Sequence, residues 1–181
     1  MGKSLLKTLL IAFCLVLTAC SAASNLQSFT DSRDGYRFLY PNGWVEVDVK
    51  NATEGVDVVF RDLVERTENL SVIISEIPED KSLSELGTPS EVGYRFLKSR
   101  QNDDSDREAE FLSADSREGE NHEYYILEYA VTLPNQQQRH NIASVAVSRG
   151  KLFTFNLSTS EQRWQQVREK FNIIVRSFSV Y

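Results

Sequence analysis

Two residues far apart in the sequence have the types and spacing to bind a cation together. His140 opens the segment RHNIASVAV, and Glu161 follows 21 residues later, at the expected start of the last helix. One predicted hairpin lies between them, and an antiparallel hairpin returns the chain to where it began. The imidazole and the carboxylate would then form either a plain ion pair or hydrogen bond, or two ligands of a divalent cation. Two ligands are too few for a closed structural zinc site, so water or a partner would complete an open one.

Catalytic motifs are absent from the sequence. The other histidine, His122, follows a predicted turn at Gly119 and is expected on the surface, leading a tyrosine-rich strand. Its HEYYI segment lacks the second histidine of a zinc-protease helix. Neither a Gly-x-Ser-x-Gly elbow nor a glycine-rich phosphate loop occurs. Carboxylates are plentiful, but in an acidic chain they mostly serve solvation. We therefore expect no enzyme activity and no required cofactor.

The first twenty residues, MGKSLLKTLLIAFCLVLTAC, read as an export signal. Two lysines precede an apolar run of about nine residues, which is too short for a membrane-spanning helix of roughly 20. The closing LTAC resembles the bacterial lipobox, whose cysteine is lipidated and becomes the first mature residue. The alternative is an ordinary signal peptide with an accidental cysteine. We expect a signal peptide at 1–19, a lipid-anchored tether at 20–28 with the lipid on Cys20, and one domain at 29–181.

Net charge and cysteine content limit the kinds of partner that the protein is expected to bind. The chain holds two cysteines, and cleavage before Cys20 removes the other one, Cys14. The mature domain then has no disulfide and depends on its core. Loss of two lysines moves the net charge from −6 to about −8, because 20 basic residues become 18 against 26 acidic ones. An acidic surface argues against nucleic acid and against electrostatic docking on anionic lipid. Any membrane link is expected to be covalent.

Strand patterns dominate the mature chain. In YRFLY the rings of Tyr36, Phe38 and Tyr40 share one face, and the longest alternating run extends from 123 to 131. The SRGK segment around Arg149 is typical of a tight hairpin between two strands, and Glu118–Gly119 suggests another turn. The early YRFLY strand is expected in the same sheet as the others.

Two segments show helix patterns. TPSEVGYRFLKSR begins with Thr88 as the N-cap and Glu91 as the partner in a capping box, although Gly93 weakens the helix. STSEQRWQQVREKFNIIVRSF carries an apolar stripe that includes Trp164 and Phe171 and should cover a sheet. The fold class expected is therefore α+β, with a central antiparallel sheet flanked by helices in an α-β-α sandwich.

Four segments taken in order resemble the PsbP family of extrinsic lumenal proteins of photosystem II. They are GYRFLYPNGW, RHNIASVAVSRGKLFTFN, EQRW and IVRSFSV. The resemblance covers roughly residues 29–181, and the lipobox points to the cyanobacterial branch, whose members are lipoproteins of the thylakoid lumen. The resemblance implies a non-catalytic protein on the lumenal side of the thylakoid membrane, bound to photosystem II subunits or assembly intermediates and linked to the oxygen-evolving complex.

The resemblance also implies weak binding of zinc, manganese or calcium, because His140 and Glu161 fall where the family has a histidine and an acidic residue. Plant members carry a longer N-terminal arm that helps retain calcium and chloride. Here only about eight residues separate Cys20 from Phe29. We therefore expect an assembly or accessory role. Two alternatives stay open: an envelope lipoprotein of the same fold with another partner, and a small-ligand or metal carrier with a deep pocket lined by the tyrosine-rich strand.

Overall fold

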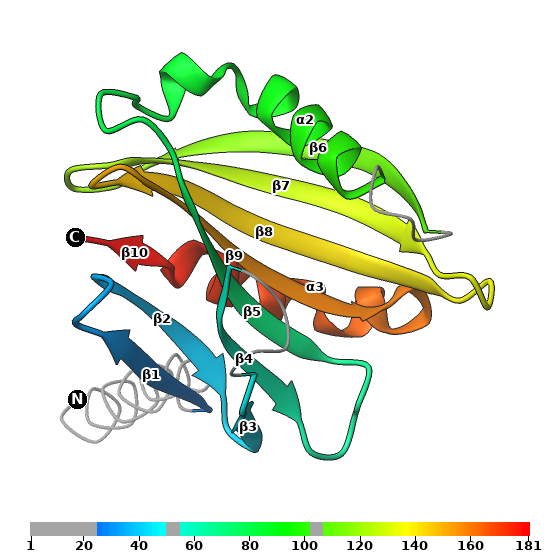
Figure 1. Cartoon of the computed structure of the whole chain (residues 1–181). Helices are drawn as coiled ribbons and strands as arrows, with labels where there is room; N and C mark the ends of the chain where they lie inside the picture. Colours follow the sequence, from blue (N-terminus) through cyan, green and yellow to red (C-terminus); the bar gives the residue numbers. More distant parts are fainter. Residues whose placement is uncertain (1–24, 50–54, 102–106) are drawn as a thin grey trace, which may run out of the picture.

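The computed structural model describes residues 25–49, 55–101 and 107–181 (Figure 1). The predicted signal peptide and Cys20 lie outside these residues. Within the described part, no helix combines the length and apolarity needed to cross a membrane. The elements in chain order are β1 (Leu26–Asp31), β2 (Tyr36–Pro41), β3 (Trp44–Val47), β4 (Val56–Asp62), β5 (Asn69–Glu76), the 3-10 helix η1 (Ser84–Leu86), α2 (Pro89–Gln101), β6 (Glu108–Glu118), β7 (Glu123–Thr132), β8 (Gln138–Ser148), β9 (Lys151–Ser160), α3 (Glu161–Ser177) and β10 (Ser179–Val180).

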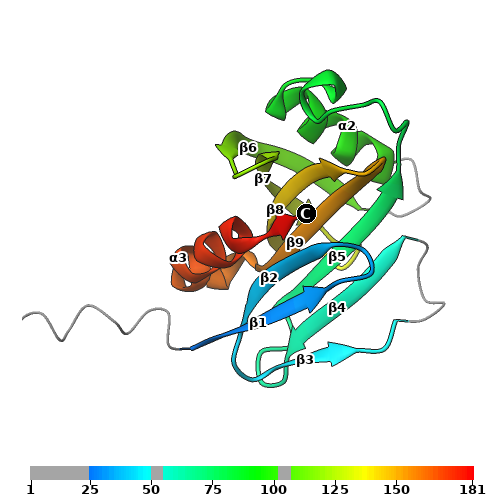
Figure 2. The ribbon, with the colours of Figure 1, turned by 90° about the vertical axis from the view of Figure 1, so that its left-hand side faces the viewer.

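A seven-stranded antiparallel sheet forms the centre of the molecule, in the order β3-β4-β5-β9-β8-β7-β6. Figures 1 and 2 show α2 and α3 on opposite faces of this sheet. Successive side chains of β7 point to opposite faces of the sheet, so this one strand contributes to the cores on both faces. Tyr124 and Ile126 belong to the core under α3, whereas Tyr125 and Leu127 belong to the core under α2. The predicted α+β class and its two covering helices are confirmed.

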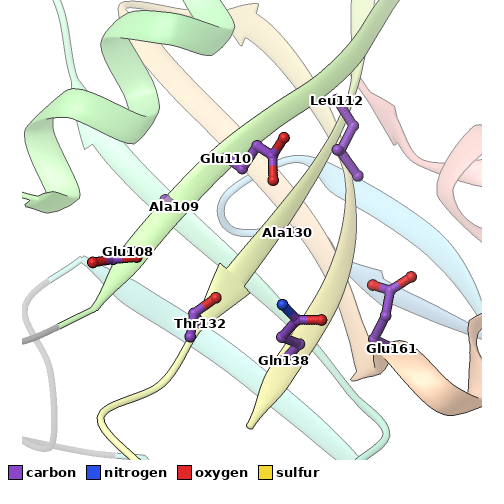
Figure 3. Close-up of a pocket in the computed structure, with 8 residues that line it drawn as sticks. All are labelled: Glu108, Ala109, Glu110, Leu112, Ala130, Thr132, Gln138 and Glu161. Atoms are coloured by element: carbon purple, nitrogen blue, oxygen red, sulfur yellow. The ribbon is translucent and has the colours of Figure 1, made fainter. Parts of the chain in front are cut away.

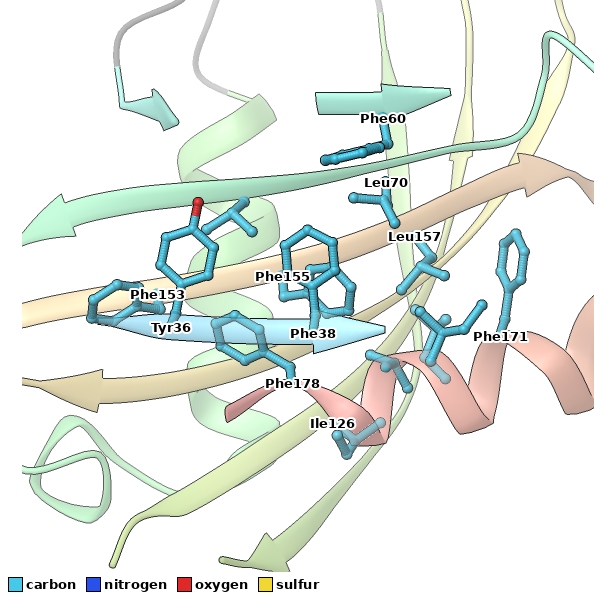
Figure 4. Packing of buried hydrophobic residues seen from close by; sticks show 14 of the residues in the cluster. Tyr36, Phe38, Phe60, Leu70, Ile126, Phe153, Phe155, Leu157, Phe171 and Phe178 are labelled. Atoms are coloured by element: carbon cyan, nitrogen blue, oxygen red, sulfur yellow. The ribbon is translucent and has the colours of Figure 1, made fainter. Parts of the chain in front are cut away.

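The predicted YRFLY strand exists as β2, but it lies in a different sheet from the one expected. It is the middle strand of a separate three-stranded sheet, β1-β2-β10. Its rings pack across the layers, with Phe38 stacked on Phe155 of β9 at 4.7 Å between ring centroids (Figure 4). This small sheet therefore covers the part of the central sheet that α3 leaves free. Alternation showed which face of the strand is buried, but it carries no information about the strand's hydrogen-bonding partners.

Local sequence signals fix the turns and caps. Arg149 and Gly150 both adopt positive φ, 52° and 69°, as a two-residue hairpin turn requires, which confirms the SRGK prediction. The backbone N–H of Thr88 donates to the Glu91 carboxylate at 2.8 Å, as the predicted capping box requires. Gly93 has a packing reason to interrupt the helix pattern. A Cβ at this position would lie 2.5 Å from Cε2 of Phe111, so glycine allows α2 to approach β6 closely.

A cluster at Asp34 links the β1–β2 turn to the β8–β9 turn. Its carboxylate accepts hydrogen bonds from Lys151 Nζ at 2.8 Å and Arg33 Nε at 2.9 Å, and its main-chain carbonyl accepts one from Arg149. The hydrogen bond from Lys151, more than the one from Arg33, holds the pKa of the Asp34 carboxyl below its usual value, although burial opposes the shift. The ionised carboxylate thus ties the two sheets together at one end of the molecule.

Removing this carboxylate should produce a pH-dependent loss of stability. A lowered folded-state pKa contributes stability that is complete above the unfolded-state pKa, near 4, and disappears as pH falls through the folded-state value. We expect Asp34→Asn to lower the free energy of unfolding by about 1 kcal/mol at pH 7, with the deficit shrinking below pH ~4. Urea melts across this range measure it, with the exposed Asp80→Asn as a control. A deficit that stays constant with pH would contradict the assignment.

Candidate metal site at His140

The β8–β9 hairpin brings His140 and Glu161 into direct contact. His140 lies near the start of β8 and pairs with Thr159 near the end of β9. The helix α3 begins at Glu161 without an intervening loop, because β9 ends at Ser160. The His140 Nδ1 and Glu161 Oε2 atoms are 2.8 Å apart, which is a hydrogen-bond distance. The structure therefore places the two predicted residues side by side.

A second carboxylate and an indole complete the surroundings of the ring. His140 Nε2 lies 2.8 Å from Glu128 Oε1, and the ring stacks on Trp164 with centroids 3.9 Å apart. Only 4% of the His140 side chain is exposed, against 43% for Glu161. The ring is therefore fixed in position, with its two nitrogens aimed at two different carboxylates.

Glu128 was missed by the sequence reasoning, although a signal was present. Strand alternation sets it on the same face as Tyr124 and Ile126, where a charged side chain needs a partner. That partner is His140 of β8. In the register between the two strands, His140 pairs directly with Ala130, which is two residues from Glu128 on the same face of β7. The side chains of Glu128 and His140 therefore lie close together. The sequence alone could have flagged Glu128 as a carboxylate on a buried face.

Two protonation states of the ring suit two different roles. Only the doubly protonated imidazolium can donate to both carboxylates at once. A neutral ring that donates from Nε2 to Glu128 instead leaves the Nδ1 lone pair facing Glu161. Metal-binding histidines typically show this second arrangement, in which a carboxylate on the other nitrogen orients the ring. The donor set therefore fits a divalent ion held by His140 Nδ1 and Glu161, with Glu128 as a positioning residue. An imidazole nitrogen suits zinc better than calcium, which takes oxygen ligands.

Glu161 also faces a solvent-open hollow of about 370 Å³. Figure 3 shows Glu161, Gln138 and Glu110 arranged around it. Its lining is mostly polar, so water molecules could complete the coordination of an ion held at the edge of the hollow. The lining residues are Glu108, Ala109, Glu110, Leu112, Ala130, Thr132, Gln138 and Glu161.

The PsbP family model matches residues 24–180, which include every strand and helix described above. The chain belongs to the PsbP family. It is 55% identical over 180 residues to CyanoP of Synechocystis sp. strain PCC 6803, covering 97% of this chain and 94% of that protein. It is 49% identical over 179 residues to CyanoP of Thermosynechococcus vestitus, covering 96% of each chain.

Solved structures agree with the PsbP fold. The solution structure of CyanoP from Synechocystis sp. PCC 6803 matches with a TM-score of 0.75 and 52% identity, over 91% of this chain and 99% of that one. The yeast Ran-binding protein Mog1p matches with a TM-score of 0.56 and 10% identity, over 86% of this chain and 95% of that one. The second likeness shows the fold alone.

Other candidate groups in this PsbP-family chain have structural partners. Within residues 25–49, 55–101 and 107–181, the one group of three carboxylates close enough to share an ion is Asp31, Asp34 and Asp57. Asp57 accepts the hydroxyl of Tyr36, and Asp34 is paired with Lys151, so these charges already have partners. These two carboxylates thus take part in the contacts that join the two sheets.

His122 differs from expectation, and the tyrosines of β7 argue against the alternative of a carrier pocket. His122 is half-buried in the turn before β7, which begins at Glu123, so it is a turn residue and not a strand residue. Tyr125 donates its hydroxyl to the Gly87 carbonyl at 2.9 Å, and Tyr129 donates to Asn156 Oδ1 at 2.9 Å. Because these polar ends are used inside the fold, the tyrosine-rich strand does not supply the polar groups that a carrier pocket would need.

Proposed function

We propose that the chain is a non-catalytic, lipid-anchored accessory protein of photosystem II on the lumenal side of the thylakoid membrane. It would support assembly of the photosystem or of its oxygen-evolving complex. The observation that carries the proposal is the family match over residues 24–180, together with 55% identity to CyanoP over 97% of the chain. Capture of the tagged protein from solubilised membranes, with identification of the subunits that accompany it, tests the proposal.

A different photosynthetic complex is the second candidate partner. The Photosynthetic NDH subunit of lumenal location 1 of Arabidopsis thaliana is 26% identical over 166 residues, covering 91% of this chain and 66% of that protein. Its name describes that related protein as an NDH subunit with a lumenal location. The identity to CyanoP is about twice as high, so photosystem II is favoured. An envelope partner outside photosynthesis is a third outcome of the same experiment.

Lipidation of Cys20 supplies the membrane link in this proposal. The motif LTAC is the observation that supports lipidation. The acidic composition of the chain leaves no general electrostatic attraction to an anionic bilayer, so the protein needs another link to the membrane. Mass spectrometry of the mature protein should show acyl chains on the N-terminal cysteine, and Cys20→Ala should lose them while the domain stays folded. An unmodified Cys20 in the mature wild-type protein would rule out the lipid anchor. It would not affect the proposal that photosystem II is the partner.

The His140 site is proposed to bind zinc weakly. Calorimetric titration of the mature protein should show one site, and His140→Ala or Glu161→Gln should lower its affinity at least tenfold. Glu128→Gln should also lower the affinity, by about 10- to 100-fold, because an uncharged amide replaces the carboxylate that orients the ring and raises its basicity. The affinity should fall as pH is lowered, since protons compete with the metal for the ring nitrogen. If the double variant His140→Ala/Glu161→Gln binds zinc as well as the wild type does, the two residues do not form a metal site. They would then form only an ion pair in the wild-type protein.

A further inference from the structure

The connection between β4 and β5 presents two adjacent apolar side chains to solvent. Leu63 is 59% exposed and Val64 is 93% exposed. Single exposed apolar residues are ordinary, but an adjacent pair at the tip of a hairpin suggests a contact surface. We call residues 63 and 64 the apolar tip.

The apolar tip is held in place by its neighbours. The Asp62 carboxylate accepts hydrogen bonds from the backbone N–H groups of Val64 at 2.7 Å and Glu65 at 3.1 Å, and from Trp44 Nε1 at 3.0 Å. On the other side of the loop, the buried Glu68 carboxylate accepts a hydrogen bond from Arg163 of α3 at 2.7 Å. The exposure of the tip therefore belongs to a well-defined conformation and does not reflect a loosely attached loop.

The apolar tip lies at the end of the molecule where the N-terminal segment enters the fold. The backbone N–H of Asn42 donates to the Asn25 carbonyl at 3.0 Å, and two residues later Trp44 pairs with Asp62, the residue before the tip. Figures 1 and 2 both show the start of β1 and the β4–β5 connection at the same end. Cys20 is five residues before Asn25, so even a fully extended chain places the two within about 18 Å.

The charged side chains beside the tip favour contact with a bilayer surface, because the carboxylates have partners within the protein and the arginines are exposed. Asp62 faces Trp44 and the loop backbone, and Glu65 accepts a hydrogen bond from the Thr67 hydroxyl at 2.7 Å. Glu68 is paired with Arg163, so all three carboxylates near the tip have partners within the protein. Arg61 and Arg66, which flank the tip, are exposed. Guanidinium groups beside an apolar pair can meet lipid phosphates while the apolar side chains enter the headgroup boundary.

We propose that the apolar tip is a second membrane contact. Leu63 and Val64 would insert into the headgroup boundary of the same leaflet that holds the lipid on Cys20. The inference rests on the anchor in the proposed function and extends it from attachment to orientation. Two contacts at one end fix which face meets the membrane. The edge formed by β6 and α2, at the other end of the strand order, then points away from the bilayer and stays accessible to a partner.

The experiment adds the lipid chemically, so that it does not depend on lipidation in the cell. The mature chain, residues 20–181, is prepared without lipid, and Cys20, its one thiol, is coupled to N-hexadecylmaleimide. A single acyl chain binds membranes marginally and reversibly, so a second contact is measurable. Sedimentation with vesicles of phosphatidylcholine and a minor fraction of phosphatidylglycerol should show about tenfold weaker binding for Leu63→Ser/Val64→Ser. The matched control Tyr94→Ser/Leu112→Ser, which removes two exposed apolar side chains from α2 and β6, should stay within about twofold of the parent.

A second readout locates the tip directly and needs no loss of function. Vesicles that carry nitroxide-labelled lipids should quench the fluorescence that Val64→Trp adds to that of the native Trp44 and Trp164, and they should not quench the fluorescence that Tyr94→Trp adds. Unchanged vesicle binding of the tip variant, or equal quenching at both positions, would overturn the proposal and assign the tip to solvent or to a protein partner. Mass spectrometry of Cys20 from cells tests the natural anchor separately, so failure of the anchor and failure of the tip are distinguishable.

Discussion

Replacing Phe171 by alanine should lower the free energy of unfolding by about 3–5 kcal/mol. The ring is fully buried, with Trp44 at 6.2 Å and Trp164 at 6.3 Å between ring centroids, both edge-to-face. It packs between α3 and the central sheet, beside Trp44 at the start of β3. Removing it leaves a cavity lined by rigid aromatic rings that cannot collapse into it. Chemical denaturation followed by tryptophan fluorescence measures the loss.

A control on the same helix separates burial from helix formation. Ile173 is 47% exposed, so Ile173→Ala truncates an apolar side chain of the same helix at a solvated position and should change stability by less than about 1 kcal/mol. Equal losses for the two variants would mean that α3 does not pack on the sheet through the Phe171 face.

Arg163→Met should destabilise the fold by about 3 kcal/mol, because it leaves the Glu68 carboxylate buried without its cation. The Glu68 side chain is 1% exposed, and the side chain of its partner Arg163 is 35% exposed at the surface of α3. The interaction joins the β4–β5 connection to the first turn of α3. Chemical denaturation at neutral pH measures the loss.

A double substitution tests the cause of that loss. Adding Glu68→Leu to Arg163→Met removes the uncompensated charge and should recover most of the stability, since apolar groups can replace a buried ion pair at little cost. Arg168→Met, at an exposed position of the same helix, should be nearly neutral. No recovery in the double variant would show that packing of the Arg163 stem, and not the buried charge, is responsible.

Local patterns predicted the elements, because their causes are local. The stripe of α3, the capping box at Thr88 and the turn at Arg149 each depend on residues within a few positions of one another, and each is present. The membership of β2 in a second sheet depends on which segment supplies its hydrogen bonds. Those bonds come from β1 and from β10, which lies more than 130 residues away, and no local pattern encodes that pairing.

The site was predictable only in part, for the same reason. A hairpin has a definite geometry, so His140 and Glu161 could be paired by counting residues along it. Glu128 required the register between β7 and β8, which the sequence leaves open. The Glu68–Arg163 pair joins residues 95 positions apart on different elements and was not foreseen. Side-chain contacts between distant elements follow from tertiary packing, which periodicity does not specify.

The central claim is that this chain works with photosystem II, and capture from native membranes tests it most directly. The chain carries an affinity tag after Tyr181, whose side chain is 52% exposed, and is expressed in the organism that makes it. Membranes are solubilised in mild detergent, and captured subunits are quantified against an untagged control. We expect photosystem II subunits or assembly intermediates to be enriched at least tenfold over the control, and over subunits of the NDH complex. Enrichment of NDH or envelope proteins without photosystem II subunits would contradict the account.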